Sequence, residues 1–262
     1  MSSAPLYIVE NCSFRYGAAD ILTALDFTLK PGKFYGLIGP NGSGKSTLIS
    51  LLMGTWLPCS GKILFKNKII QSYNQRTLAQ HISFVPQDIS IGFDFSVYDI
   101  VLMGRHPHIP RFQRPSQNDL DIVNDVLDLL DITHIRHRPV THLSGGEKQR
   151  VIVARAFAQN TEVLMLDEAT SNLDIEHTIE ILRVLRKRVS TSGKTVLAAL
   201  HDLNLAAAFC DELLVLKDST LLNSGPVHTV LTTDLLKDVF SVKGKVSYHG
   251  THPRIEYEML PD

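Results

Sequence analysis

The sequence has few cysteines, almost no net charge and no long apolar run, and each shortage argues against a class of protein. Its three cysteines in 262 residues are too few and too scattered for a disulfide framework or a zinc site. The 26 basic and 27 acidic side chains leave a formal charge of −1, which argues against nucleic acid as the main partner. The longest apolar run, Leu205 to Cys210, is far too short to cross a bilayer.

The start of the chain carries no targeting signal that we can recognise. Met1 to Cys12 lacks the basic start and the apolar core of a signal peptide. Together with the missing membrane span and the few cysteines, this predicts a protein of a reducing compartment that is cytosolic, or held to a membrane only by partners.

The segment from Gly39 to Thr47 organises the chain, because it fits the phosphate-binding pattern G-x-x-x-x-G-K-[ST]. A short apolar strand is expected before it, at Phe34 to Ile38, and an apolar helix face after it, from Leu48 to Met53. Such a loop aims backbone N–H groups and a helix N-terminus at one anion. The residues expected to bind the nucleoside triphosphate here are Gly39, Pro40, Asn41, Gly42, Ser43, Gly44, Lys45, Ser46 and Thr47.

Within this loop, two side chains have distinct expected roles. Lys45 is expected to meet the terminal phosphates as a point charge, and Ser46 to offer its hydroxyl to Mg²⁺. A second acidic element fits the same chemistry: the apolar strand expected at Val163 to Leu166 ends at Asp167 and Glu168. An aspartate there can hold Mg²⁺, and the next carboxylate can polarise an attacking water.

Two further polar residues follow expected buried strands, and both have alternative interpretations. Gln87 follows the strand expected at Ile82 to Val85 and can ligate the metal or orient water; a lone glutamine can also be an ordinary surface residue. His201 follows the strand expected at Thr195 to Leu200 and can hydrogen-bond a γ-phosphate, although a lone histidine is more often structural.

Residues 89 to 158 read as a helical segment. An apolar helix is expected at Val97 to Gly104, and an amphipathic helix is expected after the capping box of Ser116 and Asp119. The loop between them carries Arg105, Arg111 and Arg114 and no acidic residue. This loop is either a solvated basic loop or a docking surface.

A second anion-binding helix start is expected at Ser144, which can cap a helix whose first amides Gly145 and Gly146 leave open. With this segment, the ordered motifs resemble those of the ATP-binding cassette (ABC) ATPases. In that family's terms, Gly39 to Thr47 is similar to the Walker A loop, Leu143 to Glu147 to the signature motif and Val163 to Asp167 to the Walker B strand. The remaining correspondences are Ser171-Asn172-Leu173-Asp174 with the D-loop, Glu168 with the catalytic carboxylate, His201 with the switch histidine, and Tyr16 with the aromatic residue that stacks on adenine.

The resemblance implies an α/β fold of the P-loop NTPase (RecA-like) type. It has a parallel sheet core, an antiparallel β subdomain and an inserted α-helical subdomain. The implied ABC ATPase domain spans residues 5–240, with the β and RecA-like lobe at 5–88 and 159–240 and the helical subdomain at 89–158. Residues 241–262 form a tail in which a hairpin is expected.

The resemblance also implies ATP and Mg²⁺ as cofactors and a homodimer with two composite sites. In each site Lys45, Gln87, Glu168 and His201 of one copy act on ATP, and Ser144, Gly145 and Gly146 of the other copy close over it. Ser46, Gln87 and Asp167 form the implied Mg²⁺ site.

Two segments, around Val97 to Arg105 and His201 to Asp211, resemble the ATPase subunits of bacterial importers for iron–siderophore chelates, haem and cobalamin. Such a subunit lies at the cytoplasmic face of the cell membrane, under two permease subunits that an external binding protein supplies. The segment after Gln87 would then receive the permease. The alternative is a soluble ABC ATPase of DNA repair, translation or Fe–S assembly that is not coupled to transport.

Overall fold

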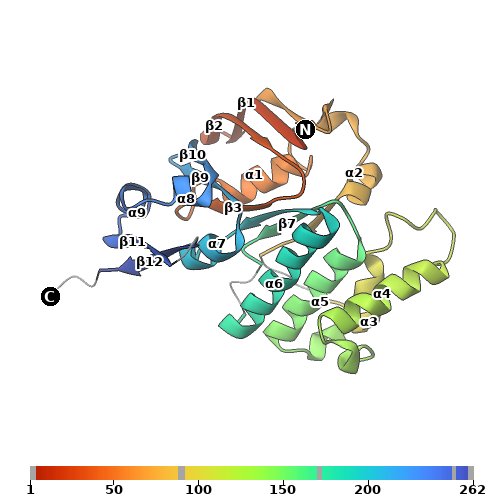
Figure 1. The fold of residues 1–262 in the computed structure, drawn as a ribbon. Helices are drawn as coiled ribbons and strands as arrows, with labels where there is room; N and C mark the ends of the chain where they lie inside the picture. Colours follow the sequence, from red (N-terminus) through yellow and green to blue (C-terminus); the bar gives the residue numbers. More distant parts are fainter. Residues whose placement is uncertain (1–3, 88–91, 170–172, 250–251, 259–262) are drawn as a thin grey trace. The chain divides into compact units, whose positions relative to one another are not determined.

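The computed structural model describes residues 4–87, 92–169, 173–249 and 252–258, and the chain divides into two compact units. The first unit comprises residues 1–73 and 188–262, and the second comprises residues 74–187. In Figure 1 the first unit has the colours from both ends of the colour bar, and the second unit has the colours from its middle. No helix in the described part of the chain is long and apolar enough to cross a membrane.

The antiparallel sheet of the first unit has the strand order β2-β1-β4-β5. Its strands are β1 (Tyr7–Tyr16), β2 (Ala19–Leu29), β4 (Ser60–Phe65) and β5 (Lys68–Ile69). In β1 the buried side chains are Tyr7 and Val9, then Cys12 and Phe14. The change of parity coincides with a register shift between Val9 and Cys12, where Asn11 has φ 45°. This bulge keeps both halves of the strand facing the same core.

The parallel strands of the first unit are arranged around β3 (Phe34–Ile38), which pairs with β8 on one side and β9 on the other. The partner strands are β8 (Thr195–Ala199), β9 (Glu212–Lys217) and β10 (Thr220–Pro226), the last antiparallel to β9. Every residue of β3 is buried. An unbroken apolar run suits a parallel strand that is covered on both faces.

The remaining elements of the first unit pack around these strands. They are α1 (Lys45–Leu52), α7 (Leu203–Phe209), α8 (Val227–Val230), α9 (Thr233–Phe240) and the hairpin of β11 (Gly244–His249) and β12 (His252–Tyr257). Asn204 joins α7 to the hairpin, because its Oδ1 accepts the Ile255 N–H at 2.8 Å. Its Nδ2 also donates to the Ile255 carbonyl at 3.4 Å.

The second unit has two parallel strands and a set of helices. The strands are β6 (Ile82–Val85) and β7 (Val163–Asp167), and the helices that begin in this unit are α2 (Gln75–His81), α3 (Val97–Met103), α4 (Gln117–Leu129), α5 (Gly145–Ala158) and α6 (Ile175–Ser192). The helices α3, α4 and α5 each begin at a serine followed three residues later by an acidic side chain. Each pair forms a complete capping box, at Ser96, Ser116 and Ser144. The sequence therefore fixes these three helix starts locally.

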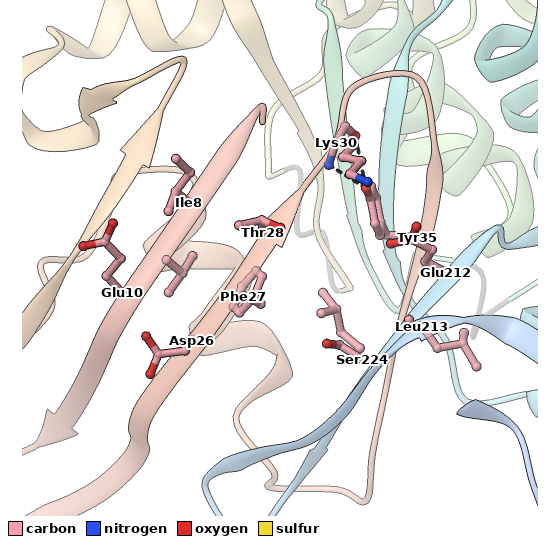
Figure 2. A pocket seen from close by; sticks show the side chains of 13 residues that line it. Ile8, Glu10, Asp26, Phe27, Thr28, Lys30, Tyr35, Glu212, Leu213 and Ser224 are labelled. Carbon is pink, nitrogen blue, oxygen red and sulfur yellow. Dashed lines mark hydrogen bonds between the residues drawn. The ribbon is translucent and has the colours of Figure 1, made fainter. Parts of the chain in front are cut away.

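A cavity of about 470 Å³ in the first unit is lined by residues of β1, β2, β3, β9 and β10 (Figure 2). Two of its charged side chains form ion pairs: Glu10 pairs with Lys62 at 2.8 Å, and Glu212 pairs with Lys33. Figure 2 shows Tyr35 of β3 reaching the Lys30 backbone, whose N–H its hydroxyl accepts at 2.6 Å. Burial, and to a lesser extent nearby carboxylates, raise the pKa of this phenol. The contact between Tyr35 and Lys30 therefore ties β3 to the end of β2.

Candidate functional site

The phosphate loop connects β3 to α1 and has the shape that its glycines dictate. A Cβ atom on Gly39 would lie 2.2 Å from the Leu216 carbonyl oxygen and 2.8 Å from Ser43 Oγ. Gly44 has φ 97°, and a Cβ atom there would lie 2.6 Å from Leu22 Cδ2. Contacts this short do not occur for real side chains, so the loop can keep its path only with glycine at both positions.

The polar groups of this loop suit a phosphate chain. Lys45 is only 4% exposed, and its ammonium donates to the carbonyls of Gly39 at 3.0 Å and Pro40 at 3.1 Å. Ser43 Oγ is buried and has no hydrogen-bond partner among the described residues. Ser46 is exposed on the first turn of α1. This helix start therefore combines a buried cation, an unsatisfied hydroxyl and an exposed hydroxyl. These groups suit a phosphate and a metal ion bound to it.

His201 lies at the same edge of the parallel strands as the phosphate loop. It is exposed and follows β8, in which Ala199 pairs with Leu37 of β3. Directly after it, Asp202 caps α7 by accepting the N–H groups of Asn204 at 2.8 Å and Leu205 at 3.1 Å. The carboxyl ends of neighbouring parallel strands thus bring the loop and the histidine to one side of the first unit.

Tyr16 ends β1 and belongs to a cluster of three aromatic rings. Its ring centroid lies 4.9 Å from that of Phe14 and 5.2 Å from that of Trp56, and both pairs meet edge to face. Phe14 is buried, whereas Tyr16 and Trp56 are 45% and 41% exposed. The family resemblance implied Tyr16 alone. The signal for Trp56 is that it is the only tryptophan of the chain and lies in the segment that follows the helix of the phosphate loop.

Gln87, Asp167 and Glu168 come together within the second unit. The strands β6 and β7 run parallel with Val85 opposite Leu166, so Gln87 and the two carboxylates leave the strands at the same edge. Asp167 is 7% exposed, while Glu168 is half-buried. Glu168 also has φ 48°, a left-handed conformation that is uncommon for a residue with a side chain. Such local strain, held by the surrounding structure, is typical of functional positions.

The helix start at Ser144 is exposed and rigidly capped. Ser144 Oγ and N donate to Glu147 Oε2 at 2.7 and 2.8 Å, and Ser144 Oγ accepts the Glu147 N–H. Hydrogen bonds from the Ser144 backbone and hydroxyl lower the pKa of Glu147, and Arg138 contributes. Gly145 is exposed, and a Cβ atom built on it would have nothing within 4 Å. The first turn of α5 is thus open to another molecule.

The same helix is joined to the strand end that carries Glu168. Gln149 is buried on α5, and its side-chain amide donates to the Ala169 carbonyl at 2.5 Å.

Of the segment that resembles a D-loop, Ser171 and Asn172 lie outside the described residues. Asp174 accepts from the His177 backbone N–H at 2.9 Å and contacts His177 Nδ1 at 2.6 Å.

The predicted basic loop contains residues of two different kinds. Arg105 is 5% exposed, and its guanidinium donates to Asp119 Oδ1 at 2.9 Å and to the Ala158 carbonyl at 2.7 Å. It therefore holds the helices together and is not part of a solvated loop. Arg111 and Phe112 are exposed, with the guanidinium 4.9 Å from the ring centroid.

Part of the segment after Gln87, where the permease is expected to dock, is buried. Val97, Ile100 and Val101 are at most 3% exposed, because they form the apolar face of α3. Alanine substitutions at these residues would disturb the fold instead of testing docking. Other positions of this stretch, among them Tyr98, Asp99 and Phe112, are exposed or half-exposed and can be reached by another protein.

The predicted site residues thus form two sets. The phosphate loop, Tyr16 and His201 belong to the first unit, and Gln87, Asp167, Glu168 and the helix start at Ser144 belong to the second. Apart from Tyr16 and the helix start at Ser144, the residues of each set follow the carboxyl ends of that unit's parallel strands.

Comparison with known proteins identifies several similar chains. The family model described as ABC transporter matches residues 22–171. The chain is 39% identical over 252 residues to the hemin import ATP-binding protein HmuV of Bordetella parapertussis, which covers 93% of this chain and 95% of that protein. It is 38% identical over 242 residues to the cobalamin import ATP-binding protein BtuD of Halobacterium salinarum, covering 92% of this chain. The chain spans 60% of the length of that relative.

Among solved structures, the fold is similar to a chain of an inward-facing ABC transporter assigned to the metal-chelate type. The TM-score is 0.83 with 32% sequence identity, and the match covers 98% of each chain. This likeness confirms the α/β fold class that the sequence motifs predicted.

Proposed function

The chain belongs to the ABC transporter family, and on this premise we propose that it is the ATP-hydrolysing subunit of an importer for a metal chelate. The observation that carries the proposal is the phosphate loop, whose glycine path and buried Lys45 suit a triphosphate. The names of the similar hemin and cobalamin import proteins, and the metal-chelate type of the similar structure, support the importer class and the kind of cargo.

The roles we propose for the two sets of residues follow from their chemistry. The amides of residues 39–47 and the ammonium of Lys45 bind the phosphates, and Ser46, Gln87 and Asp167 hold Mg²⁺. When bound, Mg²⁺ supplies positive charge that offsets the charge of the phosphate oxygens. Glu168 accepts a proton from the attacking water, and His201 donates a hydrogen bond to the γ-phosphate. Tyr16 stacks on the base of the nucleotide.

We further propose that two copies of the chain complete each other's sites. The sequence holds one phosphate loop and one Ser144-Gly145-Gly146 helix start, and the latter is open at its first turn. A helix start with free amides is a second anion site, so it can bind the γ-phosphate held by another copy. ATP hydrolysis then depends on association of the two copies.

In this proposal the membrane-spanning part of the importer lies in other chains. The dimer works on the cytoplasmic side of the membrane under two permease subunits, and an external binding protein delivers the chelate to them. Tyr98, Asp99 and Phe112 offer the accessible surface for the permease in the second unit.

Glu168→Gln tests the catalytic assignment. We expect ATP binding to persist while ATP turnover falls by about 10²- to 10⁴-fold, the usual contribution of a general base. Glu180→Gln makes the same change at an exposed position of α6 and should leave turnover unchanged. Turnover at the wild-type rate in the Glu168→Gln protein would refute the role of this carboxylate.

The importer assignment needs a different measurement. The chain should copurify with a polytopic membrane protein, and vesicles containing both should take up hemin, cobalamin or a ferric siderophore only with ATP. Two results together would favour a soluble ABC ATPase. The chain would hydrolyse ATP without any membrane partner, and cells that lack the chain would import all three compounds normally.

A further inference from the structure

In the aromatic cluster at the end of β1, two of the three packed rings are partly exposed to solvent, unlike rings in a protein core. Phe14 is its buried floor, and its ring lies 4.9 Å from Tyr16 and 5.5 Å from Trp56. The rings of Tyr16 and Trp56 are 5.2 Å apart at an angle of 86°. Both stay more than two-fifths exposed. Two large aromatic side chains are thus held in fixed mutual orientation with much of their surface in water.

This cluster is attached to the phosphate loop on two sides. Phe14 pairs across the strands with Leu22, and Leu22 Cδ2 is the atom that a Cβ on Gly44 would meet at 2.6 Å. Trp56 lies in the segment that follows α1, and its backbone N–H donates to the Ser50 carbonyl of that helix at 3.4 Å. The exposed rings therefore belong to the same local frame as the phosphate-binding helix.

The far end of the same segment is also fixed. The Cys59 N–H donates to the Ser13 carbonyl of β1 at 2.8 Å, and the Thr55 N–H donates to the Ser50 carbonyl at 3.0 Å. The chain from 53 to 59 is thus tied to α1 at one end and to β1 at the other. This double attachment fixes the backbone that carries the Trp56 indole beside Tyr16.

We propose that Trp56 is a positioning residue for the base of the bound nucleotide. Its indole holds the Tyr16 ring in the orientation that stacks on the base. The proposal rests on the proposed nucleotide-binding function. An aromatic ring recognises a planar base by stacking and reads few of its polar edge groups, so selectivity between adenine and guanine nucleotides is expected to be low.

The magnitude follows from the two interactions involved. Stacking of a base on an aromatic side chain corresponds to about a 5- to 150-fold change in affinity on substitution by alanine. An edge-to-face ring pair corresponds to about a 2- to 12-fold change. We therefore expect Tyr16→Ala to raise the Kd for MgATP more than Trp56→Ala, and Trp56→Phe to stay within about 2-fold of wild type.

The test compares two ligands on the full chain by calorimetry: MgATP, and magnesium tripolyphosphate, which lacks the base. Trp56→Ala should weaken MgATP binding and leave tripolyphosphate binding unchanged. The double variant Tyr16→Ala/Trp56→Ala should bind MgATP no more weakly than Tyr16→Ala, because Trp56 acts through Tyr16. A purely structural role of Trp56 would lower thermal stability without separating the two ligands, and that result would overturn the proposal.

The wild-type chain gives an independent reading, because Trp56 is its only tryptophan. MgATP should change the tryptophan emission, and tripolyphosphate should not. The inference would be refuted if the wild-type chain bound MgATP with no change in emission and Trp56→Ala bound MgATP as tightly as wild type. That outcome would leave the nucleotide-binding function intact. Failure of the wild-type chain to bind either ligand would instead refute the proposed function on which the inference rests.

Discussion

Replacing Asp119 by alanine should destabilise the second unit strongly, because it leaves a buried guanidinium without its counter-charge. Arg105 and Asp119 are 5% and 7% exposed, and the carboxylate accepts the Arg105 Nε–H at 2.9 Å. Breaking a buried ion pair from one side costs about 3–5 kcal/mol, because the remaining charge stays in the interior. Asp119 also accepts the Ser116 N–H at 2.9 Å in the capping box of α4, whose loss adds about 1 kcal/mol.

The free energy of unfolding can be measured by urea titration followed by far-ultraviolet circular dichroism. For a chain of this size the ion-pair cost alone corresponds to a fall in Tm of about 6–20 °C. Asp125→Ala is the matched control, because Asp125 is exposed on the same helix, and it should change stability by less than about 0.5 kcal/mol. Arg105→Met/Asp119→Asn removes both charges and should recover most of the loss.

The pH dependence gives a second check. Burial alone would raise the pKa of Asp119, but the hydrogen bonds from Ser116 and Arg105 outweigh it and lower the pKa. The stabilisation is therefore complete above the unfolded-state pKa of about 4 and is lost as the pH falls through the lower folded-state pKa. The difference between wild type and Asp119→Asn should shrink in that acidic range. A loss below about 1 kcal/mol in Asp119→Ala at neutral pH would refute the reasoning.

Two glycine substitutions separate nucleotide binding from closure by the second copy. Gly39→Ala puts a Cβ atom 2.2 Å from the Leu216 carbonyl oxygen, so it should abolish MgATP binding in calorimetry; retained affinity would contradict the rigid loop path. Gly145→Ala meets nothing within its own chain, so it should raise stability by up to about 1 kcal/mol and leave MgATP binding intact. It should nevertheless lower ATP turnover and ATP-dependent dimerisation, because the added methyl group lies where the partner's phosphate is expected. Wild-type turnover in Gly145→Ala would count against the composite site.

The sequence was sufficient where a local pattern has a single structural solution. The glycine and lysine spacing of residues 39–47 predicted the loop between β3 and α1, and Ser116 with Asp119 predicted the start of α4. In each case a short pattern of neighbouring residues is enough to predict the local structure.

The sequence was insufficient where a long-range contact decides. Arg105 looks like the other basic residues of its loop, and only the packing of α4 and α5 makes it a buried partner of Asp119. The segment Thr220 to Pro226 carries Asn, Ser, Gly and Pro, which favour turns, yet it forms β10 by pairing with β9. Trp56 reaches Tyr16 across forty residues of sequence, a contact that no local pattern records.

The hydrogen bond from the Gln149 side chain to the Ala169 carbonyl couples the position of α5 to that of the end of β7. If another molecule displaces the first turn of α5, the turn at Glu168 must move with it or this buried hydrogen bond must break. Breaking it costs about 1–3 kcal/mol. The turn that carries Glu168, the carboxylate we propose to be catalytic, can thereby respond to a molecule that contacts α5 through protein contacts alone.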